Sequence, residues 1–259
     1  MGKGTTITQP TLSAVVITFN EEKNISRCIN SLQAVCDEII IVDSFSSDNT
    51  IVLARELPKV KAHQTPWKGY SETKNFANAL ASGKFILSVD ADEELSAELQ
   101  EAIARALPTL GDNETCEVNR LTNYCGRWIR HSGWYPEYKT RLFPKEGSQW
   151  HGSLHEELVR STPRASRRLA GHLLHYSYPT VQSHLNKIDR YASLAVKKDT
   201  DAGKRYDLLT HGILKPFFVF VRKYFLQAGF LDGYYGFVIA VNSAYERFLR
   251  YAKYRELRR

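Results

Sequence analysis

The sequence has no apolar run approaching the roughly 20 residues that a membrane-spanning helix requires. Its opening stretch, MGKGTTITQPT, also lacks an apolar core of signal-peptide length. The four cysteines contain no Cys-x-x-Cys pair, which favours buried thiols in a reducing compartment over a disulfide framework or a zinc site. We therefore expect a cytoplasmic protein with a short disordered lead at residues 1–11.

Two phosphate-binding fingerprints are also missing. There is no Gly-x-Gly-x-x-Gly and no Gly-x-x-x-x-Gly-Lys-Ser/Thr, which argues against a dinucleotide-binding Rossmann domain and a P-loop ATPase. No recognised nucleic-acid-binding motif accompanies the basic residues, so no nucleic-acid partner is expected. The 259 residues, 43% hydrophobic and 24% charged, are typical of a folded protein with one large domain, alone or with an appendage.

Strand-like and helix-like segments alternate from Ser13 to Pro108. This alternation predicts an α/β fold with a mostly parallel sheet and helices on both faces. Gly83, which follows the third helix, is expected in the left-handed conformation that often ends a helix. The expected strands are 13–18, 38–42, 60–63 and 85–89, and the expected helices begin near Asn20, Asp48, Tyr70 and Ser96.

Polar segments follow three of these strands: TFNEE, DSFSSD and DADEE. In doubly wound sheets, ligands bind at the carboxyl ends of the strands. Asp90 and Asp92, two residues apart, can turn toward a single divalent cation. Taken alone, DADEE is better explained as an acidic helix start. The agreement of three segments favours a metal site that holds a phosphorylated ligand.

Together, these segments resemble the family 2 glycosyltransferases, which have the GT-A fold. The resemblance covers roughly residues 12–110 and implies a UDP-sugar donor, a saccharide or glycolipid acceptor and a divalent metal, Mg or Mn. Many members have two adjacent aspartates where this chain has Asp43-Ser44. The residues that carry the resemblance are Thr18-Phe19-Asn20-Glu21, the segment IIIVDSFSSDNT, Lys74-Asn75 and Asp90-Ala91-Asp92.

The resemblance implies a role for each matched residue, and Asp92 would bind the metal. Each residue also has a purely structural interpretation, as a helix cap, a turn or a solvated face. The implied nucleotide contacts are Thr18, Phe19, Asn20 and Glu21 at the base and ribose, Asp43 at the base, Lys74 near the nucleotide and Asp90 at the ribose.

From Glu117 the pattern changes to strand-like segments rich in aromatic and basic residues. Trp134, Tyr135 and Arg141 are candidate acceptor contacts, because aromatic ring faces stack on sugar CH groups and polar groups meet hydroxyls. Gly133 places the two aromatic residues in a turn. An aromatic core within a mixed sheet is an equally weighted alternative.

An inverting transfer also needs a base that deprotonates the acceptor hydroxyl. Glu156 is the first candidate and Glu157 the second, although Glu157 also fits an exposed helix start. His155 is a candidate metal or phosphate contact. His172 and His175 lie three apart on an expected strand and so on opposite faces, where one of them can approach the metal.

The surplus positive charge lies in the C-terminal tail. From Lys204 to Arg259 there are 11 basic and 4 acidic residues, whereas the preceding 203 residues contain 24 of each. The two aromatic, basic segments 213–230 and 237–254 suit an anionic membrane surface, which would place the protein on the inner face of the cytoplasmic membrane. A helical cover over the catalytic domain is the alternative.

We expect a glycosyltransferase domain at 12–203, with a nucleotide-binding half (12–110) and an acceptor half (111–203), and a helical extension at 204–259. The segments Tyr224–Gly233, Trp-Tyr-Pro and Leu-His-Glu resemble the bacterial lipopolysaccharide core glucosyltransferases of this family. That resemblance implies transfer of glucose from UDP-glucose to an inner-core heptose. The alternatives are a metal-dependent nucleotidyltransferase and a non-catalytic membrane or nucleic-acid adaptor on the same fold.

Overall fold

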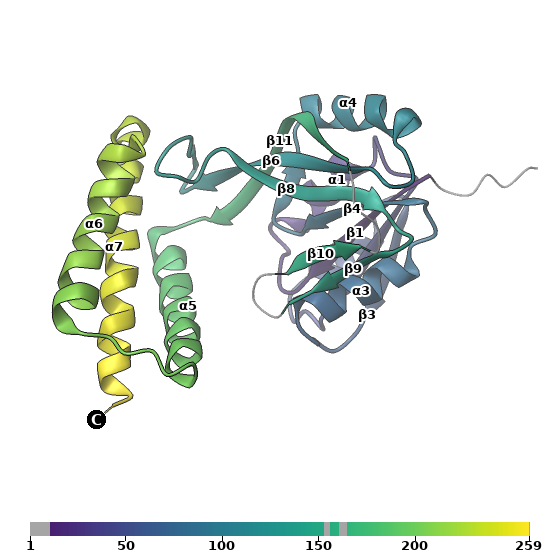
Figure 1. The fold of residues 1–259 in the computed structure, drawn as a ribbon. Helices are drawn as coiled ribbons and strands as arrows, with labels where there is room; N and C mark the ends of the chain where they lie inside the picture. Colours follow the sequence, from purple (N-terminus) through teal and green to yellow (C-terminus); the bar gives the residue numbers. More distant parts are fainter. Residues whose placement is uncertain (1–10, 153–155, 161–164, 259) are drawn as a thin grey trace, which may run out of the picture. The chain divides into compact units, whose positions relative to one another are not determined.

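The computed structural model describes residues 11–152, 156–160 and 165–258. The chain forms two compact units: unit 1 comprises residues 1–120 and 138–175, and unit 2 comprises residues 121–137 and 176–259 (Figure 1). No helix within the described ranges has the length and apolar character needed to cross a membrane.

Unit 1 is built on a twisted sheet. Strands β6, β8 and β11 have residues in both units. The strands are β1 (Leu12–Thr18), β2 (Glu38–Asp43), β3 (Val60–Gln64), β4 (Phe85–Asp90), β5 (Glu93–Leu95), β6 (Thr115–Tyr124), β8 (Glu137–Pro144), β9 (Ser148–His151), β10 (Glu157–Arg160) and β11 (Ser166–Tyr178). The helices are α1 (Ile25–Leu32), α2 (Thr50–Arg55), α3 (Tyr70–Leu80) and α4 (Ala97–Ala106).

The strand order of the main sheet is β3-β2-β1-β4-β8-β6-β11-β5. The first four strands are parallel, as the alternation predicts, whereas β8 runs antiparallel to β4 and β11 antiparallel to β5. The carboxyl ends of β1, β2 and β4 therefore lie along one edge. Strands β9 and β10 form a separate antiparallel hairpin.

Both faces of the parallel strands are buried, which explains their continuous apolar sequences. On one face, α1 and α4 pack against alternate residues such as Val16 and Ile41. On the other face, α3 and the ring of Trp150 cover Val15 and Ile40. The predicted mostly parallel sheet with helices on both faces is confirmed.

Two local expectations are wrong. Helix α1 begins at Ile25 with Asn24 as its N-cap, because Asn20 instead adopts a left-handed turn with φ 54°. Gly83 does not have a positive φ. A glycine is needed there for space, since a Cβ atom would lie 2.5 Å from Ser13 Oγ and 2.8 Å from the Ser13 backbone nitrogen.

Unit 2 is mainly helical, so the predicted C-terminal helices are present. Helix α7 packs against both α5 and α6 (Figure 1). Tyr124, Ile129 and Ile239 form its buried centre. The elements are strand β7 (Arg127–Trp128), α5 (Val181–Asp201), a π-helical segment (Leu208–Leu214), α6 (Lys215–Val221), a second π-helical segment (Arg222–Leu226), a 3-10 turn (Gly229–Asp232) and α7 (Gly233–Glu256).

Candidate active site

The last residue of β4, Asp90, lies at the centre of a cluster of charged side chains in unit 1. Its Oδ1 is 3.3 Å from Lys74 Nζ, and its Oδ2 accepts a hydrogen bond of 2.8 Å from Arg141. Lys74 comes from α3 and Arg141 from β8, so three elements place these groups together. Burial alone would raise the pKa of Asp90, but the Arg141 and Lys74 charges outweigh it and hold that pKa well below its usual range.

The side chain of Glu93 holds Arg141 of this cluster in position. The guanidinium of Arg141 donates to both oxygens of Glu93, at 2.6 and 2.8 Å, and Arg120 lies 3.6 Å away. Glu93 Oε2 also accepts a 2.9 Å hydrogen bond from the backbone N–H of Asp90. Glu93 therefore shapes the turn that presents Asp90 and Asp92.

Asp92 faces a histidine from β11. Its Oδ2 lies 3.3 Å from His175 Nε2, and both side chains remain partly exposed. A carboxylate oxygen beside an imidazole nitrogen is a donor pair that suits Mn²⁺ and other divalent ions. Among the described residues, no group of three or more such side chains comes together. The pair thus fits a metal whose remaining ligands would come from a bound phosphate and water.

Glu156 and Asp90 both interact with Lys74. Glu156 Oε1 accepts a 2.8 Å hydrogen bond from Lys74 Nζ, which also lies over the Trp150 ring at 4.9 Å from the centroid. Burial would raise the pKa of Glu156, but the Lys74 charge outweighs it and lowers that pKa. Glu157 is exposed on β10, opposite His151 in the hairpin. His155 lies outside the described residues.

Hydrogen bonds join the loop after β1 to the loop after β2. The Asn20 backbone N–H donates to Ser46 Oγ at 2.8 Å, and Asn20 Oδ1 accepts from the Ser47 N–H at 2.8 Å. The Glu21 N–H donates to Thr50 Oγ1 at 2.7 Å. These bonds hold the two strand-end segments as one rim.

Two aromatic rings are exposed on that rim. Phe19 and Phe45 are each 56% exposed. Phe45 was not among the predicted contacts, although an exposed aromatic residue inside the polar segment DSFSSD was a usable signal. Flat apolar rings beside polar loops suit stacking against a nucleotide base.

Asp43 and Thr18 lie side by side, since they are register partners at the ends of β2 and β1. Asp43 is fully buried, and its carboxylate accepts hydrogen bonds from Ser46 and Gln64. The buried Thr18 hydroxyl has no hydrogen-bond partner among the residues that the structure describes. Asp43 is therefore held rigidly at the carboxyl edge of the sheet.

The three candidate acceptor contacts belong to different units: Arg141 lies in unit 1, and Trp134 and Tyr135 lie in unit 2. Arg141 is only 5% exposed and is bound to the carboxylates of Asp90 and Glu93. Trp134 lies in unit 2, in an aromatic cluster with Tyr124, Tyr178 and His184. That surrounding matches the aromatic-core interpretation.

Tyr135 also lies in unit 2, where it stacks below Arg130 with the guanidinium carbon 5.5 Å from the ring centroid. Of the two histidines on β11, the His175 side chain lies beside Asp92, and the His172 backbone N–H donates to Ser96 Oγ at 2.9 Å.

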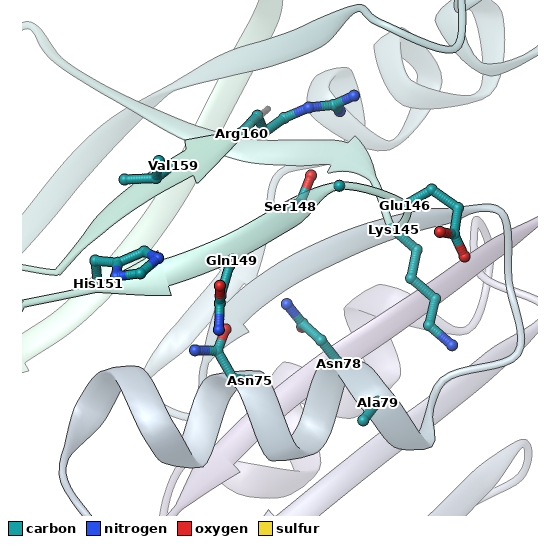
Figure 2. Close-up of a pocket in the computed structure, with 11 residues that line it drawn as sticks. Asn75, Asn78, Ala79, Lys145, Glu146, Ser148, Gln149, His151, Val159 and Arg160 are labelled. Carbon is teal, nitrogen blue, oxygen red and sulfur yellow. The ribbon is translucent and has the colours of Figure 1, made fainter. Parts of the chain in front are cut away.

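A separate groove of about 590 Å³ lies between α3 and the β9–β10 hairpin (Figure 2). None of the predicted site residues that the structure describes lines it. Several of its polar groups already serve the fold: Asn75 bonds the Trp150 backbone at 2.8 and 2.9 Å, and Lys145 Nζ donates to the Ala81 carbonyl. The charged cluster at Asp90 is therefore the better candidate for chemistry.

Comparison with known proteins gives one consistent family. The family model for glycosyl transferase family 2 matches residues 13–165. An uncharacterized glycosyltransferase of Rickettsia typhi, RT0209, is 32% identical over 260 residues, covering 95% of this chain and 87% of the relative. The lipopolysaccharide core biosynthesis glycosyltransferase LpsC of Rhizobium meliloti is 30% identical over 251 residues, covering 93% and 91%.

Among solved structures, the S. aureus TarS 1–349 complex with UDP matches with a TM-score of 0.45 and 15% sequence identity. The match covers 95% of this chain and 91% of that one.

Proposed function

Because the chain belongs to glycosyltransferase family 2, we propose that it moves a sugar, with glucose expected, from a UDP-sugar to a saccharide or lipid-linked acceptor in lipopolysaccharide core or other cell-envelope glycan synthesis. The observation that carries the proposal is the charged cluster at the end of β4, where Lys74, Asp90 and Arg141 meet beside Asp92. The name of the Rhizobium meliloti relative supports the acceptor class.

In this proposal, the joined loops after β1 and β2 bind the nucleoside. The exposed rings of Phe19 and Phe45 offer stacking surfaces for the base. Asp43 and Thr18 would supply polar atoms at the strand ends, and Asp90, the last residue of β4, is assigned to the ribose. These assignments follow from the position of each residue on the carboxyl edge of the sheet.

Asp92 and His175 are the residues that would hold a divalent ion, Mg or Mn. A bound ion would supply positive charge that stabilises the leaving nucleoside diphosphate. Lys74 adds a fixed positive charge of the chain itself close to the same position.

Glu156 is the proposed base. Its carboxylate is ionised at neutral pH and can therefore accept the proton of the acceptor hydroxyl. The hydroxyl oxygen then bonds to the anomeric carbon as the bond from that carbon to the diphosphate oxygen breaks. This single displacement inverts the configuration at the sugar carbon.

Calorimetric titration with UDP, with and without Mn²⁺, tests the donor site. We expect UDP binding to need the metal and to weaken about tenfold or more in Asp92→Asn and in His175→Gln. Asp112→Asn is the matched control, because the Asp112 side chain is 78% exposed and pairs with Lys84. A preference for CTP or ATP would favour a nucleotidyltransferase, and no nucleotide binding would favour a non-catalytic adaptor.

The base is tested with a pair of neighbouring variants. Glu156→Gln should lower the transfer rate about 100-fold or more while UDP still binds. Glu157→Gln should leave both nearly unchanged, since Glu157 is exposed on β10. Mass spectrometry of the glycolipid from cells that lack the protein would identify the acceptor. Full transfer by a folded Glu156→Gln protein would rule out the assigned base.

A further inference from the structure

Unit 2 carries a row of exposed apolar side chains along α6 and the π-helical segments on either side of it. We call this the α6 apolar face, and it consists of Leu214, Phe217, Phe218, Phe225 and Leu226. Each of these residues is between 51% and 72% exposed. Large contiguous apolar surfaces are uncommon on soluble proteins and usually mark an interaction site.

Helical spacing places most of these residues on one side. Phe217, Phe218 and Phe225 follow Leu214 by three, four and eleven positions, which are the spacings of a single helix face. Phe220 and Tyr224 point elsewhere and pack against Phe237 of α7, with ring centroids 6.0 and 5.7 Å apart. The α6 segment is thus anchored through one side and presents the other to solvent.

The charge around the face is mostly positive. Between Lys204 and Leu231 the chain has five lysines or arginines and a single acidic residue, Asp207. Lys215 and Arg222 are exposed at helical positions that border the apolar row. An apolar row with a basic border is the pattern of helices that lie in the interface of an anionic bilayer.

We propose that the α6 apolar face docks on the surface of an anionic lipid bilayer. The phenylalanine and leucine side chains enter the boundary between headgroups and acyl chains, and Lys215 and Arg222 meet the lipid phosphates. A second copy of the chain fits less well, because a twofold contact through this row would bring the basic borders of both copies together. Docking there would bring the enzyme to a membrane that carries a lipid-linked acceptor.

Sedimentation of the full-length protein with lipid vesicles tests this proposal. Wild-type protein should bind vesicles that contain phosphatidylglycerol more strongly than phosphatidylcholine vesicles, and added salt should weaken the binding. Phe217→Ser/Phe218→Ser should lower the affinity about tenfold or more. Lys215→Gln/Arg222→Gln should lower it by about the same factor and reduce the effect of salt.

Val52→Ser is the matched control, since Val52 is 52% exposed on α2 in unit 1, and its vesicle binding should equal that of wild type. Equal binding by wild type and Phe217→Ser/Phe218→Ser would overturn the proposal. So would a wild-type dimer, seen by analytical ultracentrifugation, that the same double variant converts to monomer. Vesicle binding needs no sugar donor, so its outcome is independent of the proposed transferase activity.

Discussion

The buried carboxylate of Glu93 links several parts of the candidate site. It pairs with Arg141, lies within 3.6 Å of Arg120 and accepts the backbone N–H of Asp90. Its side chain is fully buried, so its contacts are shielded from solvent. Removing one partner from a buried charge network leaves the others poorly compensated.

Glu93→Gln should therefore destabilise the protein by about 3 kcal/mol, as measured by urea unfolding. Glutamine keeps the side-chain size but cannot balance the Arg141 charge. Glu101→Gln is the control, because the Glu101 side chain is 70% exposed and its pair with Arg105 is a surface contact. Equal stability of the two variants would show that Asp90 alone is enough to hold Arg141.

Some site residues could be predicted from the sequence because local sequence determines their position, whereas others depend on contacts between distant segments. Asp90 and Asp92 lie at the end of an apolar, strand-like run, so their position at the edge of the sheet can be predicted from the local sequence. Glu93 and Arg141 meet only because β5 and β8 enter the sheet from distant parts of the chain. Trp134 lies next to glycine and proline in sequence, a pattern that does not distinguish a sugar-binding turn from an aromatic core.

The connection from α3 to β4 is closely packed at Gly83. Ser13 Oγ accepts a 2.8 Å hydrogen bond from the Gly83 N–H and donates to Glu38 at 2.5 Å. Ser82 also donates to Glu38 through its backbone and its side chain. This contact fixes the start of β4 against β1 and β2.

Gly83→Ala should destabilise unit 1 by about 1–3 kcal/mol, because the new methyl group would overlap the Ser13 backbone. Gly111→Ala is a matched control, since a Cβ atom there meets nothing within 4 Å. Thermal unfolding of the two variants measures the difference. A Gly83→Ala protein as stable as Gly111→Ala would mean that β1 shifts without cost.

A buried histidine joins α5 to α7 in unit 2. Asn242 donates to His184 Nδ1 at 3.1 Å, so this nitrogen acts as an acceptor and the ring is neutral, while the Tyr124 hydroxyl lies 3.0 Å from the same atom. Burial lowers the pKa of His184 from 6.5 to about 4. The unfolded chain therefore takes up a proton at a higher pH than the folded chain.

The contribution of His184 to stability is complete above pH 6.5 and is lost as the pH falls toward 4. The loss should reach about 3 kcal/mol, seen as a steeper fall in unfolding free energy for wild type than for His184→Gln. Parallel curves for the two proteins would mean that the pKa of His184 does not change on folding.

At the scale of the whole molecule, the alternation of strands and helices was sufficient to predict the four parallel strands of the sheet. It was not sufficient to predict how the chain divides. Residues 121–137 and α5 belong with the C-terminal helices in unit 2, whereas the sequence suggested a boundary at residue 203. The excess of basic residues that begins at Lys204 marks a change in surface charge and not a boundary between the units. Core contacts such as Tyr124 with Tyr235 connect segments too far apart for composition to reveal.

The division into units predicts the effect of truncation. A chain that ends at residue 203 loses Ile239, Tyr235 and Asn242, which cover Tyr124 and His184. The rest of unit 2 should then unfold, so that α5 loses hydrogen-exchange protection while strands β1 to β4 keep it. A chain that ends at Glu256 is the control and should keep both, because α7 remains whole. Persistent protection of α5 in the shorter chain would instead make residues 204–259 a separable extension.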